Sequence, residues 1–133
     1  MNTACGPIEY GEYGKGPLLL MVHGSGGGFD QGLDFARTLI PDGYRVIAPS
    51  RFGYLRTPLP AVASPMAQAD DHACLLDALG LRTLGVIGGS AGAPSSMQLC
   101  LRHPERCSSM ILLFPLAYFI VLFRIVPPTY IRD

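Results

Sequence analysis

The chain has 133 residues, 49% of them hydrophobic, and ten basic residues balance ten acidic ones to give a formal net charge of zero. This length suits one domain over residues 1–133, and the apolar content is enough for a core and excludes intrinsic disorder. Because the basic residues are scattered, no basic stripe can follow a phosphate backbone, and nucleic acid is not an expected partner.

Apolar runs and helical periodicity alternate along the chain. The run 17–22 has no polar side chain, which is typical of a strand buried on both faces. Ser64 and Pro65 suit the start of a helix, and Gly80 suits its C-terminal cap. The alternation predicts βαβ units and therefore an α/β fold with a mostly parallel sheet and helices on both faces. In chain order the expected elements are a hairpin over residues 6–22 that ends in the apolar strand, a helix over 31–40, a strand over 44–48, a helix over 64–80, a strand over 84–87, a helix up to 103 and a strand over 109–114.

Four cysteines are present, at positions 5, 74, 100 and 107. No two of them form a C-x-x-C pair, so a metal site is not expected. The even count could form two disulfides. However, no secretory signal precedes them, and the apolar helical settings of Cys74 and Cys100 favour buried free thiols and a cytoplasmic location.

The last part of the chain contains an apolar run from 111 to 123 that is interrupted by Pro115. The run is shorter than the roughly 20 residues of a spanning helix, so we expect a buried strand followed by a buried or amphipathic helix, and a membrane anchor is the weaker alternative. Residues 116–133 are either the start of a cap over the site, with apolar side chains that could line an acyl pocket, or aberrant sequence.

A glycine-flanked serine lies between the strand 84–87 and the helix that follows it. Gly88, Ser90 and Gly92 satisfy the pattern G-x-S-x-G, in which the serine occupies a sharp strand-to-helix turn that presents its hydroxyl outward. The helix that follows directs its free N–H groups and its positive dipole end toward a developing oxyanion. The alternative is a plain tight turn with a helix-capping serine.

A second glycine-rich turn, His23-Gly24-Ser25-Gly26-Gly27-Gly28, directly follows the apolar strand. It fits neither G-x-G-x-x-G nor a Walker A motif, so neither turn is expected to bind a nucleotide or another phosphate cofactor. An H-G loop after one strand with a G-x-S-x-G turn further along resembles the α/β-hydrolase superfamily. Residues 48–53 and the sequence His-Pro-Glu-Arg at 103–106 extend this resemblance, except that Pro49 or Ser50 replaces an aspartate of the family motif.

The resemblance implies a catalytic nucleophile at Ser90 and an oxyanion hole made by the backbone amides of Ser25 and Ala91, with Gly26 as the alternative donor to Ser25. Gly24, Gly26, Gly88 and Gly92 would shape the two turns. The resemblance also implies structural roles for His23 and His103, no metal or organic cofactor, and a small-molecule acyl substrate.

The remaining catalytic groups of such a hydrolase are not evident in the sequence. The superfamily orders them as serine, then aspartate or glutamate, then histidine, yet only Glu105, Asp133 and His103 follow Ser90. Glu105 and His103 lie at the far end of the helix that Ser90 begins, roughly 20 Å away by helix geometry. His72, beside two aspartates, is expected on a solvated helix face.

We therefore expect a truncated α/β-hydrolase fold that lacks its last strands, from a fragment or a partial gene. Its chemistry would be hydrolysis of an ester, thioester or C–C bond through an acyl-serine, impaired by the absent acid and histidine. The alternative is a catalytically inactive binding module whose small cavity over Ser25 and Ala91 could hold a carboxylate or acyl group. The last edge strand would be exposed or covered by the apolar tail, which predicts poor solubility or self-association.

Overall fold

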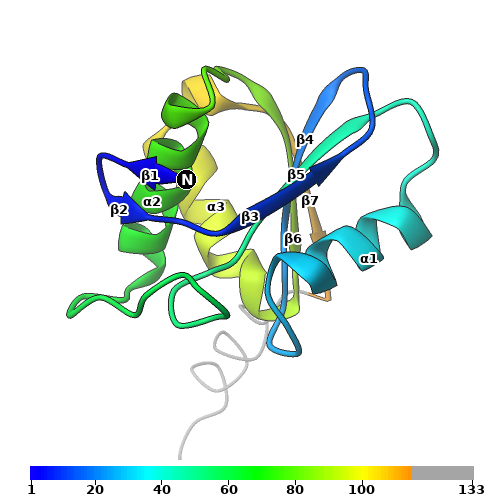
Figure 1. Ribbon diagram of the computed structural model, residues 1–133. Coiled ribbons are helices and arrows are strands. Elements are labelled where there is room, and N and C mark those ends of the chain that lie inside the picture. The colour runs from blue at the N-terminus through cyan, green and yellow to red at the C-terminus, as the bar shows by residue number, and fades with distance from the viewer. Residues whose placement is uncertain (115–133) are drawn as a thin grey trace, which may run out of the picture.

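A five-stranded sheet runs through the centre of the protein (Figure 1). The computed structural model describes residues 1–114. The strand order is β3-β5-β4-β6-β7, with β3 antiparallel to β5 and every other neighbouring pair parallel, which confirms the predicted mostly parallel sheet. The strands are Tyr10–Tyr13 (β3), Leu18–Val22 (β4), Arg45–Pro49 (β5), Leu84–Gly89 (β6) and Cys107–Leu113 (β7).

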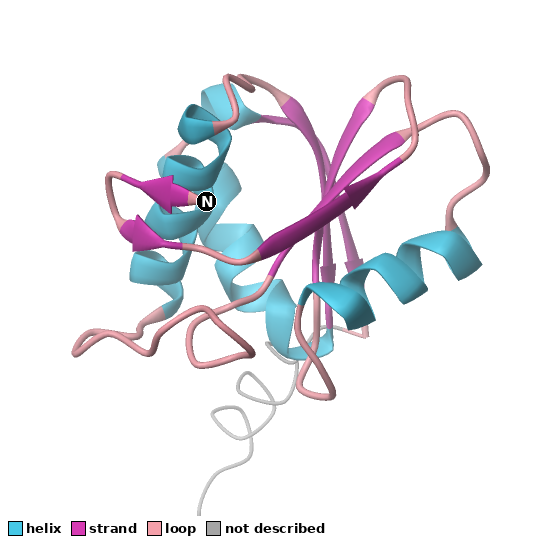
Figure 2. Ribbon diagram, viewed as in Figure 1, coloured by secondary structure: helices cyan, strands magenta, loops and turns pink. Residues whose placement is uncertain are grey.

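Helices cover both faces of this sheet, as predicted (Figure 2). Helix α1 (Phe29–Leu39) packs on one face, and α2 (Pro65–Ala78) and α3 (Ala93–Arg102) pack on the other. In β4, Leu20 and Val22 belong to the core under α2 and α3, whereas Met21 between them belongs to the core under α1. Because each face of the strand needs apolar side chains, the run has no polar residue.

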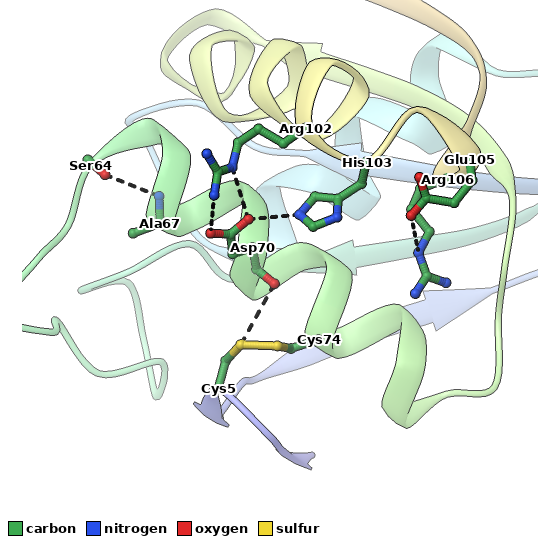
Figure 3. A network of polar contacts seen from close by, with 9 residues as sticks. All are labelled: Cys5, Ser64, Ala67, Asp70, Cys74, Arg102, His103, Glu105 and Arg106. Carbon is green, nitrogen blue, oxygen red and sulfur yellow. Dashed lines mark hydrogen bonds and ion pairs between the residues drawn. A yellow bond between two sulfur atoms is a disulfide. The ribbon is translucent and has the colours of Figure 1, made fainter.

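The helix ends follow the local signals in the sequence. The Ser64 side chain caps α2 by accepting a hydrogen bond from the amide of Ala67 at 3.1 Å (Figure 3). Gly80, just beyond the helix, has a φ of +67°, which glycine adopts without steric cost. Pro94 lies in the first turn of α3, after a 3₁₀ turn over Ser90–Gly92, and a second 3₁₀ turn over Pro104–Arg106 leads from α3 to β7.

The hairpin predicted over residues 6–22 is wrong. Strand β3 pairs with β5 and not with β4, because β5 lies between them in the sheet. Gly14 and Gly16, both with positive φ, carry the chain against the backbone of residues 43 and 44 at the start of β5. The N-terminus instead forms its own small antiparallel pair, β1 (Asn2–Thr3) with β2 (Gly6–Pro7).

The expectation of free thiols is also wrong, since the structure pairs Cys5 with Cys74 and Cys100 with Cys107. Their Cα atoms are 5.9 and 5.4 Å apart, within the usual range for a disulfide. The first bond ties the turn between β1 and β2 to α2, and the second ties α3 to β7. The cytoplasmic location rested on reduced cysteines and loses that support.

His72 is buried, with 1% of its surface exposed, rather than on a solvated face. Helix α2 contacts α3 as well as β1, so more than one side of it is covered. The His72 Nε2 atom lies 3.2 Å from Ser95 Oγ on α3, whereas its Nδ1 has no partner. Burial, supplemented by the charge on Arg51, lowers the pKa of His72 to about 3. The neighbouring Asp71 is buried too, and burial raises its pKa to about 6.

The last described strand, β7, lies at the edge of the sheet and is exposed, which agrees with the expected exposed edge strand and not with the buried strand expected from the apolar run. Met110 and Ile111 are 43% and 55% exposed, and Phe114 is 92% exposed, because no further element among residues 1–114 covers them. No helix in this range is both long and apolar enough to cross a membrane. The cap expected over residues 116–133 lies outside the described residues.

The free energy of unfolding should fall as the pH drops from 7 to 4.5. Unfolded His72, with its ordinary pKa of 6.5, binds a proton in this range, whereas the buried ring with a pKa of about 3 does not. The unfolded state therefore gains protons, and His72 alone should account for roughly 2 kcal/mol of the loss. Asp71 acts in the opposite direction by a similar amount, because its folded carboxyl stays protonated up to about pH 6. The net fall remains because the pKa of His23, which is also buried, is lowered to about 4 and adds a loss similar to that of His72.

The change His72→Gln should reduce the loss of unfolding free energy between pH 7 and pH 4.5 by roughly 2 kcal/mol. Urea unfolding at the two pH values would measure this difference. An equal fall in the variant and the parent would show that His72 does not carry this pH dependence.

Candidate active site

Ser90 occupies the sharp turn between β6 and α3. Its φ is +48°, in the left-handed region that side chains other than those of Asn and Asp rarely adopt, and its side chain is exposed. A strained, outward-facing serine at this turn is what the G-x-S-x-G pattern predicts. The turn also borders an apolar hollow of about 80 Å³, which is lined by Phe35, Leu39, Gly89, Leu113 and Phe114 in addition to Ser90.

The flanking glycines leave no room for a side chain. A Cβ on Gly88 would lie 2.6 Å from Ser96 Oγ in α3, so this glycine lets the strand and the helix approach closely. A Cβ on Gly92 would lie 2.5 Å from the His23 carbonyl oxygen and 2.6 Å from that of Val22. Gly92 therefore lets the turn that carries Ser90 pack against the end of β4. The sequence pattern does not reveal this contact between the turn after β6 and the loop after β4.

The loop after β4 lies directly against the serine. A Cβ on Gly24 would lie only 3.2 Å from the Cβ of Ser90. Ser25 and Gly26 follow in an exposed bend, and Ala91 is half-buried at the start of the 3₁₀ turn. The two segments expected to supply oxyanion donors are thus brought side by side at the C-terminal ends of β4 and β6.

His23 is fully buried, and both ring nitrogens are engaged. Its Nε2 accepts a hydrogen bond from the amide of Arg51 at 2.9 Å, so the proton is on Nδ1, which donates to the Gly24 carbonyl oxygen at 2.7 Å. Burial lowers the pKa of His23 to about 4, and the positive charge of Arg51 acts in the same direction. A neutral ring with no free nitrogen cannot take a proton from Ser90.

Arg51 and Gln31 hold this loop in place, and sequence reasoning missed both roles. The Arg51 guanidinium donates to the carbonyl oxygens of His23, at 3.0 Å from Nε, and Gly24, at 2.9 Å from Nη2. The Gln31 side chain in α1 accepts from the Gly24 amide at 2.9 Å. Ser50 is one of the two residues that could replace the aspartate of the family motif, and its hydroxyl accepts a hydrogen bond from the Phe29 amide at the start of α1 at 3.0 Å.

The other two histidines lie away from Ser90. His72 is engaged with Ser95 inside the α2–α3 interface. His103 ends α3, and its Nε2 lies 2.7 Å from a carboxylate oxygen of Asp70, which also accepts two hydrogen bonds from Arg102 (Figure 3). Glu105 pairs with Arg106 beside it. Within residues 1–114 no histidine is hydrogen-bonded to Ser90, and no group of three or more metal-ligating side chains is present.

Replacing Gly92 with alanine should destabilise the protein by about 3 kcal/mol, because the new methyl group would meet two backbone carbonyl oxygens that cannot move aside. Gly80→Ala is the matched control. Gly80 has a positive φ but open space around its Cα, so we expect a cost of about 1 kcal/mol. Urea unfolding would measure the loss of unfolding free energy in each variant. Equal losses would contradict the close approach of the two turns.

Comparison with known proteins agrees with this arrangement. The family model of the alpha/beta hydrolase fold matches residues 17–129. The chain is 30% identical over 113 residues to 2-hydroxy-6-oxo-6-phenylhexa-2,4-dienoate hydrolase of Comamonas testosteroni, a match that covers 81% of this chain and 40% of that enzyme. It is 34% identical over 105 residues to 2-hydroxymuconate semialdehyde hydrolase of Pseudomonas sp. (strain CF600), which covers 75% of this chain and 37% of that enzyme.

Among solved structures, an alpha/beta hydrolase fold protein from Nakamurella multipartita shares 44% identity with a TM-score of 0.81. That match covers 86% of this chain and 39% of the other. The chain thus spans about two fifths of the length of the proteins it matches. Since the family model covers most of the sequence, the chain belongs to the α/β-hydrolase fold family.

Proposed function

We propose that Ser90 is the nucleophile of an acyl-serine hydrolase. The observation that carries this proposal is the exposed Ser90 at a φ of +48°, against the Gly24 loop on one side and at the start of a helix on the other. In this proposal the amides of Ser25 and Ala91 stabilise the oxyanion that forms when the serine attacks a carbonyl. Gly26 is the alternative to Ser25 as donor.

The substrate class follows from the relatives and from the surface beside the serine. The named relatives hydrolyse 2-hydroxy-6-oxo-6-phenylhexa-2,4-dienoate and 2-hydroxymuconate semialdehyde, and an esterase from Exiguobacterium antarcticum shares the fold. We propose a small acyl compound with an ester, thioester or activated C–C bond. The apolar hollow of about 80 Å³ beside Ser90 suits a short acyl chain.

Catalysis by this chain is proposed to be impaired. Both ring nitrogens of His23 are hydrogen-bonded, His72 is buried between α2 and α3 with its pKa lowered to about 3, and His103 is paired with Asp70. None of them is therefore available as the general base. Oxyanion stabilisation and binding alone leave roughly 10³–10⁴-fold acceleration over water in serine hydrolases that lack triad members. Acylation of Ser90 by a reactive reagent should therefore be slow but specific.

A fluorophosphonate probe should label the chain slowly, and added imidazole should accelerate labelling by standing in for the missing base. The change Ser90→Ala should abolish labelling, with and without imidazole. Ser25→Ala is the matched control, since it removes an exposed neighbouring hydroxyl but keeps the backbone amide, and its labelling should equal that of the parent. Mass spectrometry of the intact protein gives the rates.

Labelling that persists in Ser90→Ala would overturn the assignment of the nucleophile. A folded chain that is not labelled even with imidazole would favour the alternative function, a hydrolase-like binding module without acyl transfer. Circular dichroism of each variant separates these outcomes from unfolding.

We also propose that the chain self-associates through β7. Its outer edge has no partner strand among residues 1–114, and its exposed apolar residues lie close to those of α1, including Leu39 at 58% exposure. An unpaired apolar edge strand readily adds a strand from another chain.

Sedimentation velocity should show a concentration-dependent dimer or larger species that Ile111→Lys shifts toward the monomer. The control is Val62→Lys in the loop between β5 and α2, which replaces an apolar side chain that is 68% exposed and lies on neither β7 nor α1. A monomer at all concentrations, or an equal effect of both changes, would rule out association through β7.

A further inference from the structure

A second cavity of about 160 Å³, lined by polar and apolar groups in similar measure, lies beside the turn that carries Ser90. Ala91, the residue after Ser90, forms part of its wall, together with residues from the loop after β5, from the start of α2 and from α3. Its wall includes Arg51, Ser64, Gln68, Ala91 and Ser95. It thus differs in polarity from the apolar hollow that Ser90 borders directly.

Arg51 brings an unneutralised positive charge to this cavity. Its side chain is half-buried, and it forms no ion pair with any carboxylate in the described part of the chain. Its contacts are the two backbone carbonyl oxygens of the loop and the ring of Tyr54, whose centroid lies 4.9 Å from the guanidinium carbon. A desolvated charge without a counter-ion is costly, and a carboxylate matches the planar guanidinium best.

The effect of this charge on its surroundings is consistent with a positive cavity. Burial lowers the pKa of Arg51 itself, and the Arg51 charge contributes to the lowered pKa of both buried histidines, His23 and His72. The acidic residues nearest in sequence to the cavity wall are Asp70 and Asp71. Asp70 pairs with Arg102 and His103, and the Asp71 carboxylate accepts a hydrogen bond from Gln68 at 3.3 Å, so neither pairs with Arg51.

The other polar groups in the wall are already engaged within the protein. Gln68 accepts from the Phe52 amide at 2.7 Å, and Ser95 is bonded to His72 and to the Gly92 carbonyl oxygen. Arg51 therefore dominates the electrostatics of the cavity, and a neutral polar ligand would gain little there.

The charge is also close to the reacting serine. Gly24 connects the two, since its carbonyl oxygen accepts a hydrogen bond from Arg51 Nη2 and its Cα packs against the Cβ of Ser90. A compact substrate could therefore reach both the nucleophile and the guanidinium.

We propose that this cavity is a subsite for a carboxylate carried by the substrate, with Arg51 as its counter-ion. The inference rests on the proposed acyl-serine function of Ser90 and narrows its substrate to short acyl compounds that carry a second, ionised carboxyl group.

The test is a titration of the ¹⁵N-labelled full chain with succinate, and in parallel with its neutral isostere succinamide, followed by amide NMR shifts. Succinate should shift the signals of Ala91 and Ser95 with an affinity at least tenfold higher than that of succinamide. The Ser90→Ala variant should bind succinate like the parent. Binding is thereby read independently of acylation, so a failure of the proposed function and a failure of this subsite give different results.

Variants at two positions test whether Arg51 is the group that binds the carboxylate. Arg51→Met should abolish the preference for succinate, but it also removes two bonds to the loop. Ala63→Glu avoids this difficulty, because Ala63 is an exposed residue of the cavity wall and the new carboxylate would compete for Arg51. We expect Ala63→Glu to weaken succinate binding at least tenfold and its isostere Ala63→Gln to leave it unchanged. Equal affinities for the two ligands, no binding of either, or equal effects of the two Ala63 changes would overturn the subsite.

Discussion

The contact between the loop after β4 and the turn after β6 is the constraint on which the rest of the site depends. Gly24 packs against Ser90, and Gly92 packs against the carbonyl oxygens of Val22 and His23, so each turn restricts the residues allowed in the other. Adjacent parallel strands make this possible, because their carboxyl ends meet at one edge of the sheet. The left-handed Ser90 is held by this mutual packing rather than by its own preference.

The charged Arg51 and two neutral histidines, His23 and His72, lie near the contact between the two turns. Arg51 bonds the carbonyl oxygens of residues 23 and 24 while its own amide fixes the tautomer of His23. Burial and the same charge disfavour protonation of His23 and His72, so neither ring adds a positive charge to that of Arg51. In this family member the histidines nearest the site are therefore part of the framework, and the polarity of the surface around Ser90 is set by Arg51 on one side and apolar side chains on the other.

Local signals in the sequence predicted the features that depend on local physics. The G-x-S-x-G turn, the Ser64 cap, the Gly80 end of α2 and the two-faced burial of β4 all follow from residue type and spacing. The features that were missed depend on which distant segments meet. The β3–β5 pairing, the two disulfides, the buried His72 and the clamp formed by Gln31 and Arg51 each join residues far apart or on different elements. The residues expected to contact substrate from the segment 116–133 lie outside the described range, and the roles of Ser90, Ser25 and Ala91 stay predictions.

The bond between Cys5 and Cys74 has a consequence for the unfolded chain. It joins residues 69 positions apart, so β3, β4, α1 and β5 all lie within one covalent ring that is closed on α2. Closing a ring of this size removes chain entropy worth roughly 4 kcal/mol from the denatured ensemble in the loop-entropy model. The Gly24 loop lies inside that ring and Ser90 lies outside it. An oxidised chain that has lost its tertiary structure therefore keeps β4 and β5 within one closed ring, while the turn that carries Ser90 is free to diffuse away from the Gly24 loop.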